Sequence, residues 1–68
     1  MLALTINGNA RQFDVTDFTV AQLVSKMGLE GKRIAIERNG EIVPRSAFGQ
    51  TPLASGDKLE IVGAVGGG

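Results

Sequence analysis

The sequence predicts a small α+β domain in which one amphipathic helix packs on a mixed sheet of four to five strands. Three observations indicate this class: apolar residues alternate in the first and last segments, Asn-Gly pairs separate short apolar segments, and one segment has helical periodicity. The length of 68 residues is sufficient for one domain with one hydrophobic core.

A β-hairpin is predicted at the start of the chain. Residues 2–6 (LALTI) alternate between apolar and small or polar side chains, as in a half-buried strand. Residues 7–8 are Asn-Gly, which tolerates positive φ angles and is a strong hairpin signal. A second strand is predicted over residues 11–15 (RQFDV), with Phe13 and Val15 on one face.

Residues 19–29 (TVAQLVSKMGL) form the predicted helix. Thr19 is a favourable N-cap, and Gln22 three positions later completes a capping box. Gly28 suits the left-handed position that follows many helices. The apolar stripe that would face the sheet consists of Val20, Leu23, Val24 and Met27.

Two further short strands are predicted in the middle of the chain. The first is centred on Ile34 and Ile36, and Asn-Gly at residues 39–40 turns the chain into the second, at residues 42–43. Pro44 cannot donate a hydrogen bond to a neighbouring strand, so the pairing is expected to end there.

An irregular loop and a last strand complete the domain. Phe48 and Leu53 are the apolar residues expected to anchor the loop on the core. The last strand covers residues 58–62 (KLEIV), with Leu59 and Ile61 facing inward.

This order of elements closes most simply with the last strand parallel to the first, in the middle of the sheet. The connection between these two parallel strands must be right-handed, which leaves few alternative topologies. The predicted architecture is the β-grasp, the fold of ubiquitin. We assign residues 1–65 to the β-grasp domain and residues 66–68 to a flexible C-terminal glycine tail.

The composition argues against catalysis by the chain itself. The sequence has no cysteine and no histidine, so it lacks a thiolate nucleophile, the commonest general base and the usual ligands of zinc. Seven basic and seven acidic residues are scattered along the chain, and no stretch is long and apolar enough to span a bilayer. We therefore expect a cytoplasmic protein without metal or bound cofactor that contacts neither nucleic acid nor membrane.

The closing glycines leave two interpretations open: an inert end, or a thin, mobile segment that presents a carboxylate to something outside the domain. Three extended residues reach about 10 Å, which is enough to enter a narrow channel while the folded domain stays outside. Without Cβ atoms, the segment permits close approach of the channel walls and conformations closed to other residues.

Three segments and the final glycines together resemble a known family. TVAQLVSKMGL, IAIERNGEIVPRS and GDKLEIV, followed by the terminal glycines, resemble the thiamine branch of the ubiquitin-like ThiS/MoaD family of sulfur carriers. The resemblance covers essentially all 68 residues. It implies a carrier protein rather than an enzyme.

The resemblance also implies partners and a modified residue. An E1-like adenylyltransferase (ThiF/MoeB type) would use ATP and Mg to adenylate the carboxylate of Gly68. A persulfide derived from cysteine would then convert the adenylate to a thiocarboxylate, and thiazole synthase (ThiG type) would accept the sulfur. Gly67 and Gly66 would lead Gly68 into the partner's site.

Alternation along the last strand predicts a docking surface for these partners. If Leu59 and Ile61 face the helix, Val62 and the alternate residues near it face the opposite side of the sheet. The predicted surface consists of Val62, Ala64, Val65 and Arg45, extended by Ala3 and Ala35 and bordered by Glu37.

Two other functions remain open from the sequence. The chain could carry sulfur in another pathway, as the small subunit of molybdopterin synthase or in tRNA thiolation. It could also be a β-grasp interaction module whose glycines are incidental. Removal of Gly67 and Gly68 would separate the second alternative from any sulfur carrier.

Overall fold

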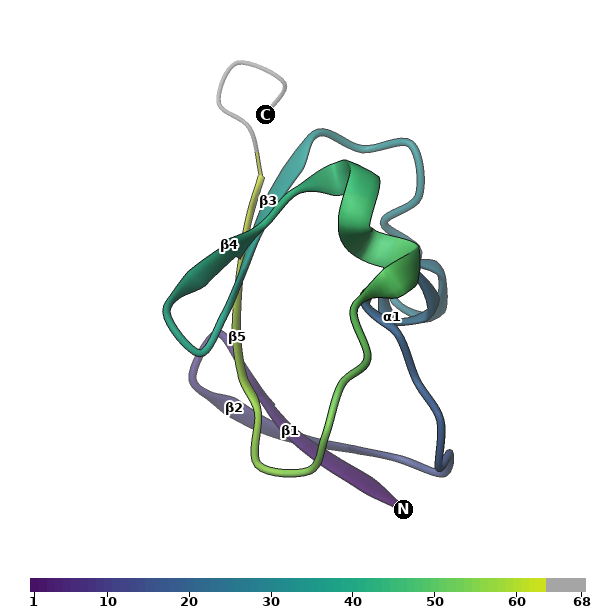
Figure 1. Cartoon of the computed structure of the whole chain (residues 1–68). Coiled ribbons are helices and arrows are strands. Elements are labelled where there is room, and N and C mark those ends of the chain that lie inside the picture. The colour runs from purple at the N-terminus through teal and green to yellow at the C-terminus, as the bar shows by residue number, and fades with distance from the viewer. Residues whose placement is uncertain (64–68) are drawn as a thin grey trace.

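The computed structural model describes residues 1–63, which form a five-stranded mixed sheet crossed on one face by a single α-helix (Figure 1). The strand order is β2-β1-β5-β3-β4, with β1 and β5 parallel and the other neighbours antiparallel. The elements are β1 (Leu2–Ile6), β2 (Asn9–Phe13), α1 (Val20–Lys26), β3 (Ile34–Arg38), β4 (Glu41–Val43), the 3-10 helix η1 (Arg45–Gln50) and β5 (Lys58–Gly63).

This topology is the predicted β-grasp, with the last strand parallel to the first at the centre of the sheet. The expected domain boundary after residue 65 and the glycine tail lie outside the described residues.

Both hairpins turn through the Asn-Gly pairs that the sequence singles out. Asn7 and Asn39 have φ angles of 51° and 53°, and the glycines after them are also at positive φ. Positive φ at both central residues defines the type I′ turn, whose twist matches that of the paired strands.

The predicted extent of the second strand is wrong. It spans Asn9–Phe13 instead of residues 11–15, because the two-residue turn pairs Ile6 with Asn9 and β1 offers no partner beyond the pair of Leu2 with Phe13. Val15 therefore lies outside the strand, where it packs half-buried against the core.

Local hydrogen bonds define both ends of α1 as the sequence predicts. Thr19 and Gln22 form the reciprocal capping box. At the other end Gly28 has a φ of 72°, and its N–H donates to the carbonyl of Ser25 while the N–H of Leu29 donates to Val24. These two bonds form a Schellman motif, which satisfies carbonyl groups that the helix leaves free.

The loop after β4 is more ordered than the sequence predicts. Instead of irregular structure throughout, it contains η1, which begins directly after Pro44. Hydrogen bonds from Val20 to Thr51 and from Leu53 to Phe18 tie this loop to the start of α1. Such distant contacts stabilise the 3-10 turn, and no local sequence pattern reports them.

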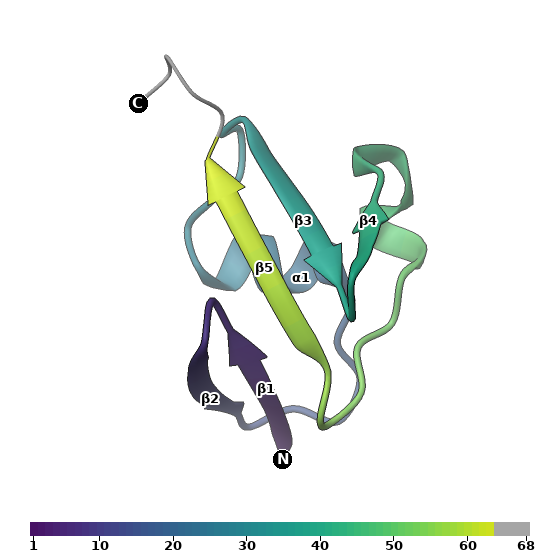
Figure 2. The same cartoon turned by 90° about the vertical axis from the view of Figure 1, so that its left-hand side faces the viewer.

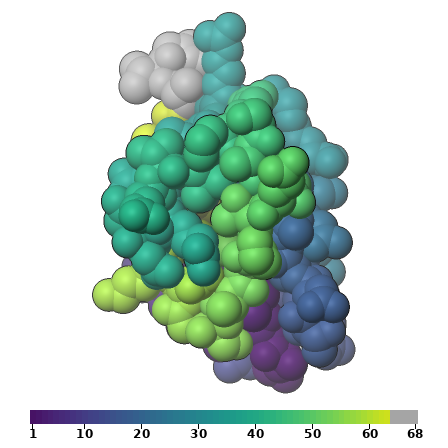
Figure 3. All heavy atoms as spheres, viewed as in Figure 1, coloured from purple at the N-terminus to yellow at the C-terminus, as the bar shows by residue number. Residues whose placement is uncertain are grey.

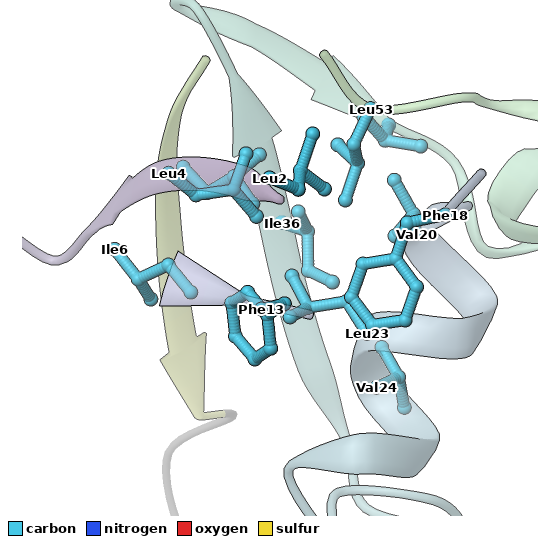
Figure 4. Close-up of a cluster of buried hydrophobic side chains, with 12 residues drawn as sticks. Leu2, Leu4, Ile6, Phe13, Phe18, Val20, Leu23, Val24, Ile36 and Leu53 are labelled. Carbon is cyan, nitrogen blue, oxygen red and sulfur yellow. The ribbon is translucent and has the colours of Figure 1, made fainter. Parts of the chain in front are cut away.

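The core lies between the sheet and α1, as Figure 4 shows, with side chains of β1, β2 and β3 pointing toward the helix. Leu23, Ile36, Leu59 and Val20 are the largest fully buried side chains. Both predicted loop anchors contribute, since Leu53 is buried and Phe48 packs against the core.

Residues on the two faces of β5 should differ in how much their mutation lowers the free energy of unfolding. Leu59→Ala removes a fully buried side chain and should lower the free energy of unfolding by about 2–5 kcal/mol. Val62→Ala, on the exposed face of the same strand, should change it by less than about 0.5 kcal/mol. Urea denaturation followed by circular dichroism measures both values. Equal losses in the two variants would contradict the assignment of faces.

Candidate functional site

β5 is the strand that leads the chain toward the predicted glycine tail. It runs through the centre of the sheet between β1 and β3, and its last residue, Gly63, pairs with Ile34 at the start of β3 (Figure 2). The predicted modified residue Gly68, its leaders Gly67 and Gly66, and the docking residues Ala64 and Val65 lie outside residues 1–63. The described part of the site is therefore the base from which the tail extends.

Asp57 fixes the point at which β5 begins. Its buried carboxylate accepts hydrogen bonds from the Arg38 guanidinium at 2.8 Å and from the Asn39 amide at 3.0 Å. It also accepts one from the backbone N–H of Ala54 at 2.9 Å, which closes the turn before the strand. Three donors thus join β5 to the loop before it and to the β3–β4 turn.

The same contacts determine the charge of this group. Burial alone would raise the pKa of Asp57. The hydrogen bond from Ala54, followed by those from the two side chains and the charge of Arg38, outweighs burial and holds the pKa below its ordinary value. Asp57 is therefore ionised near neutral pH and serves as an anchor rather than as a general acid or base.

The asparagines of the two hairpin turns both bind the backbone of β5. Asn39 Oδ1 accepts the N–H of Lys58 at 2.9 Å, and the Asn39 N–H donates to the Lys58 carbonyl at 2.8 Å. Asn7 Oδ1 accepts the N–H of Ile61 at 2.7 Å, and Asn7 Nδ2 donates to the Ile61 carbonyl at 3.0 Å. The sequence predicts these asparagines as turn residues only, because their bonds to β5 depend on the pairing of distant strands.

The outer face of the sheet, opposite α1, carries exposed apolar side chains on β5, β3 and β4. Val62 is 59% exposed and pairs with the exposed Ala35 on β3. Ile42 on β4 is 64% exposed and pairs with Glu37. Figure 2 shows this face, with α1 behind the sheet.

Ile42 on the outer face was not assigned to the docking surface from the sequence. Ile42 was expected in a strand, but its face was not assigned. Alternation with the buried Val43 is the signal that places it outward.

Arg45 does not lie with Val62 on this outer face. Its guanidinium donates to the Lys32 carbonyl at 2.8 Å and lines a hollow on the helix side, together with Val24 and Phe48. In Figure 3, η1 and the loop before β3 meet at this side of the molecule. The structure thus brings Val62 together with Ala35 but places Arg45 on a separate surface.

The part of the chain that the structure describes offers no arrangement for metal binding. Among residues 1–63, no group of three or more His, Cys, Asp and Glu side chains could hold a metal ion. The hollow beside Arg45 has a volume of about 190 Å³, below the roughly 300–1,000 Å³ of typical small-molecule sites. No helix within these residues is long and apolar enough to cross a membrane.

Comparisons with known proteins all indicate the same family. The model of the ThiS family matches residues 4–68. The chain is 34% identical over 65 residues to the sulfur carrier protein ThiS of Bacillus subtilis, covering 96% of this chain and 98% of that protein. It is similar in structure to the crystallised thiamine biosynthesis protein ThiS of Geobacter metallireducens, with a TM-score of 0.85, 32% identity and coverage of 98% and 100% of the two chains.

A third relative is a longer protein. The chain is 45% identical over 67 residues to a thiazole synthase of Paramagnetospirillum magneticum, which covers 98% of this chain. The chain spans only about a fifth of the length of that relative, since the match covers 20% of it.

The Asp57 contacts predict a loss of stability in acid. Because the pKa of Asp57 is lower in the folded chain than in the unfolded chain, its contribution is present above the unfolded pKa. That contribution is lost as the pH falls from about 5 through the folded pKa. Asp57→Asn should lower the free energy of unfolding by about 1.5–3 kcal/mol at pH 7, and by less at pH 3. Urea denaturation at both pH values measures this.

Asp14→Asn provides the matched control, because Asp14 is exposed just after β2. It should leave the free energy of unfolding at pH 7 within about 0.5 kcal/mol of the wild-type value. An Asp57→Asn variant as stable as Asp14→Asn at pH 7 would show that Asp57 does not anchor β5.

Proposed function

The chain belongs to the ThiS family, and from this membership we propose that it is a sulfur carrier for thiamine biosynthesis. The observation that carries the proposal is a family match that continues from the β-grasp domain through the final glycines. The fold supports it, because the central strand leads directly to that segment.

The proposed chemistry takes place at the carboxylate of Gly68. An oxygen of this carboxylate attacks the α-phosphate of ATP in an E1-like partner, pyrophosphate leaves, and an acyl-adenylate forms. The terminal sulfur of a cysteine-derived persulfide then displaces AMP from the acyl carbon. A thiol reduces the resulting S–S bond and releases the thiocarboxylate. ATP and Mg would belong to the partner, and the proposed location is the cytoplasm.

The folded domain supplies binding and orientation rather than catalysis. Reacting atoms must approach to about 3–3.5 Å, so the base of the tail has to be held firmly while the partner encloses its end. Ordering each tail residue costs about 1–2 kcal/mol, which contacts made by the folded domain must offset. The apolar residues Val62 and Ala35 on the outer face, next to the end of β5, are suited to this role, and Ile42 adds exposed apolar surface on β4.

Thiazole synthase is the proposed acceptor of the sulfur. A relative with that name contains a region that is 45% identical to nearly all of this chain. That a synthase contains a region similar to this carrier supports the proposal that carrier and synthase act on the same sulfur atom. The similar Geobacter metallireducens structure is that of a thiamine biosynthesis protein, which favours this pathway over molybdopterin synthesis and tRNA thiolation.

Intact mass spectrometry tests the proposed reaction. After incubation with ATP, Mg, an E1-like partner and a persulfide donor, the chain should gain the mass difference between sulfur and oxygen, located on Gly68. A variant lacking Gly67 and Gly68 should fold as the wild type and gain no mass. An unmodified wild-type chain, or a truncated chain that still gains sulfur, would contradict the proposal.

A charge on the outer face tests the proposed docking surface. Val62→Asp should raise the KM of the carrier for the adenylating partner about tenfold, equivalent to about 1.4 kcal/mol of lost binding, because the partner would bury the new charge. The control is Ala10→Asp, which places the same charge on the outer face of β2, away from β5. An unchanged KM for Val62→Asp, or an equal rise in both variants, would rule out this docking face.

A further inference from the structure

The half of β5 nearest the tail has no partner strand on its β1 side within the described chain. The pairing of β1 with β5 consists of Thr5 with Lys58 and Ile6 with Leu59. β1 ends at Ile6 because the chain then enters the Asn-Gly turn. On the other side, β3 remains paired with β5 as far as Gly63.

The side chain of Asn7 occupies the place where the next residue of β1 would pair. The backbone N–H of Asn7 donates to the Leu59 carbonyl at 2.9 Å, which continues the pairing of β1 with β5 by one hydrogen bond. Its side-chain oxygen accepts the N–H of Ile61 at 2.7 Å, and its side-chain nitrogen donates to the carbonyl of Ile61 at 3.0 Å. One amide thus acts toward Ile61 as a peptide group of a neighbouring strand would.

The position of this contact along β5 gives it a specific effect. The backbone N–H and C=O groups of successive residues in a strand point to opposite sides. Since Leu59 and Ile61 bind Asn7, the peptide groups of Glu60 and Val62 face β3. Asn7 therefore holds β5 from the side that β3 does not reach, two residues before Gly63.

We propose that Asn7 is a positioning residue for sulfur transfer, which sets the direction in which β5 leads the tail out of the domain. This inference rests on the proposed function, because it requires that the segment after Gly63 is delivered to a partner's site. A tail that leaves a strand held on both sides starts from one defined point and direction. A strand held only by β3 can pivot about that single line of hydrogen bonds, so the direction of its last residues is less well defined.

Asn39 offers a matched control within the same chain. It is the first residue of the other Asn-Gly turn, has nearly the same φ angle, and also binds the backbone of β5 through its side chain. It holds Lys58, at the end of β5 remote from the tail, and donates to Asp57 as well. Loss of the Asn39 side chain should therefore lower the free energy of unfolding more than loss of the Asn7 side chain does. It should change the direction of the tail less.

Glycine substitution removes the side chain of Asn7 or Asn39 without straining the turn, and so separates the effect of each on stability from its effect on the direction of the tail. Asn7→Gly and Asn39→Gly keep a residue that accepts positive φ and remove only the side-chain amide. Asn7→Asp is a partial variant, because its carboxylate still accepts the N–H of Ile61 but no longer donates to the carbonyl. The three variants are compared with the wild type at a temperature at which circular dichroism shows all of them folded.

Two measurements are made on each variant: amide hydrogen exchange of Ile61, and the kinetics of ATP–pyrophosphate exchange by the E1-like partner with the carrier as substrate. For Asn7→Gly we expect about tenfold faster exchange at Ile61 and a kcat about tenfold lower, with KM changed less than about twofold. Asn7→Asp should lie between this variant and the wild type. Asn39→Gly should be the least stable in urea and retain the wild-type kcat.

The outcomes distinguish this inference from the proposed function. A wild-type chain that supports no pyrophosphate exchange contradicts the proposed function, and the positioning role with it. A wild-type chain that is adenylated while Asn7→Gly turns over equally fast contradicts the positioning role alone. So does a kcat that falls in order of stability, lowest for Asn39→Gly, because Asn7 would then contribute only to folding.

Discussion

The fold and the proposed function of this domain both depend on how β5 is held. The strand is central, but the two sides are bound differently: β3 pairs with it along its length, whereas β1 pairs with only its first two residues. On the β1 side, Asn7 continues the contact at Ile61, while Asp57 just before the strand and Asn39 at its first residue tie β5 to the β3–β4 turn. The proposed reaction at the chain end would depend on this arrangement, because an error in the direction of the strand grows with distance along the chain that follows it.

The small size of the domain makes these polar contacts important. A chain of 68 residues buries only about 60% of the surface that its unfolded form exposes, so the core alone leaves a narrow margin of stability. The core is concentrated between α1 and the inner face of the sheet, where Leu23, Ile36 and Leu59 are fully buried. The outer face contributes little to folding, and its exposed Val62 and Ile42 are therefore free to serve in recognition.

The predicted docking surface shows where the alternation of side chains along a strand predicts their direction and where it fails. Alternation along the last strand predicts that Val62 faces outward, and the structure confirms that it is exposed and lies beside Ala35. Arg45 was assigned to the same surface, but its guanidinium donates to the Lys32 carbonyl on the helix side. The 3-10 turn redirects the chain directly after Pro44, so alternation no longer applies there.

The sequence by itself determined the elements that short-range rules govern: the two Asn-Gly turns, the capping box at Thr19, the glycine end of α1 and the inward residues of the last strand. These features depend on neighbours a few residues apart, so the printed order of residues contains them. Only the tertiary structure decided the ends of β2, the 3-10 turn and the contacts that hold β5. Asn7 and Ile61 are 54 positions apart, and Asn39 and Lys58 are 19 apart. Whether such groups meet depends on the register of paired strands, which the whole fold establishes and no local pattern specifies.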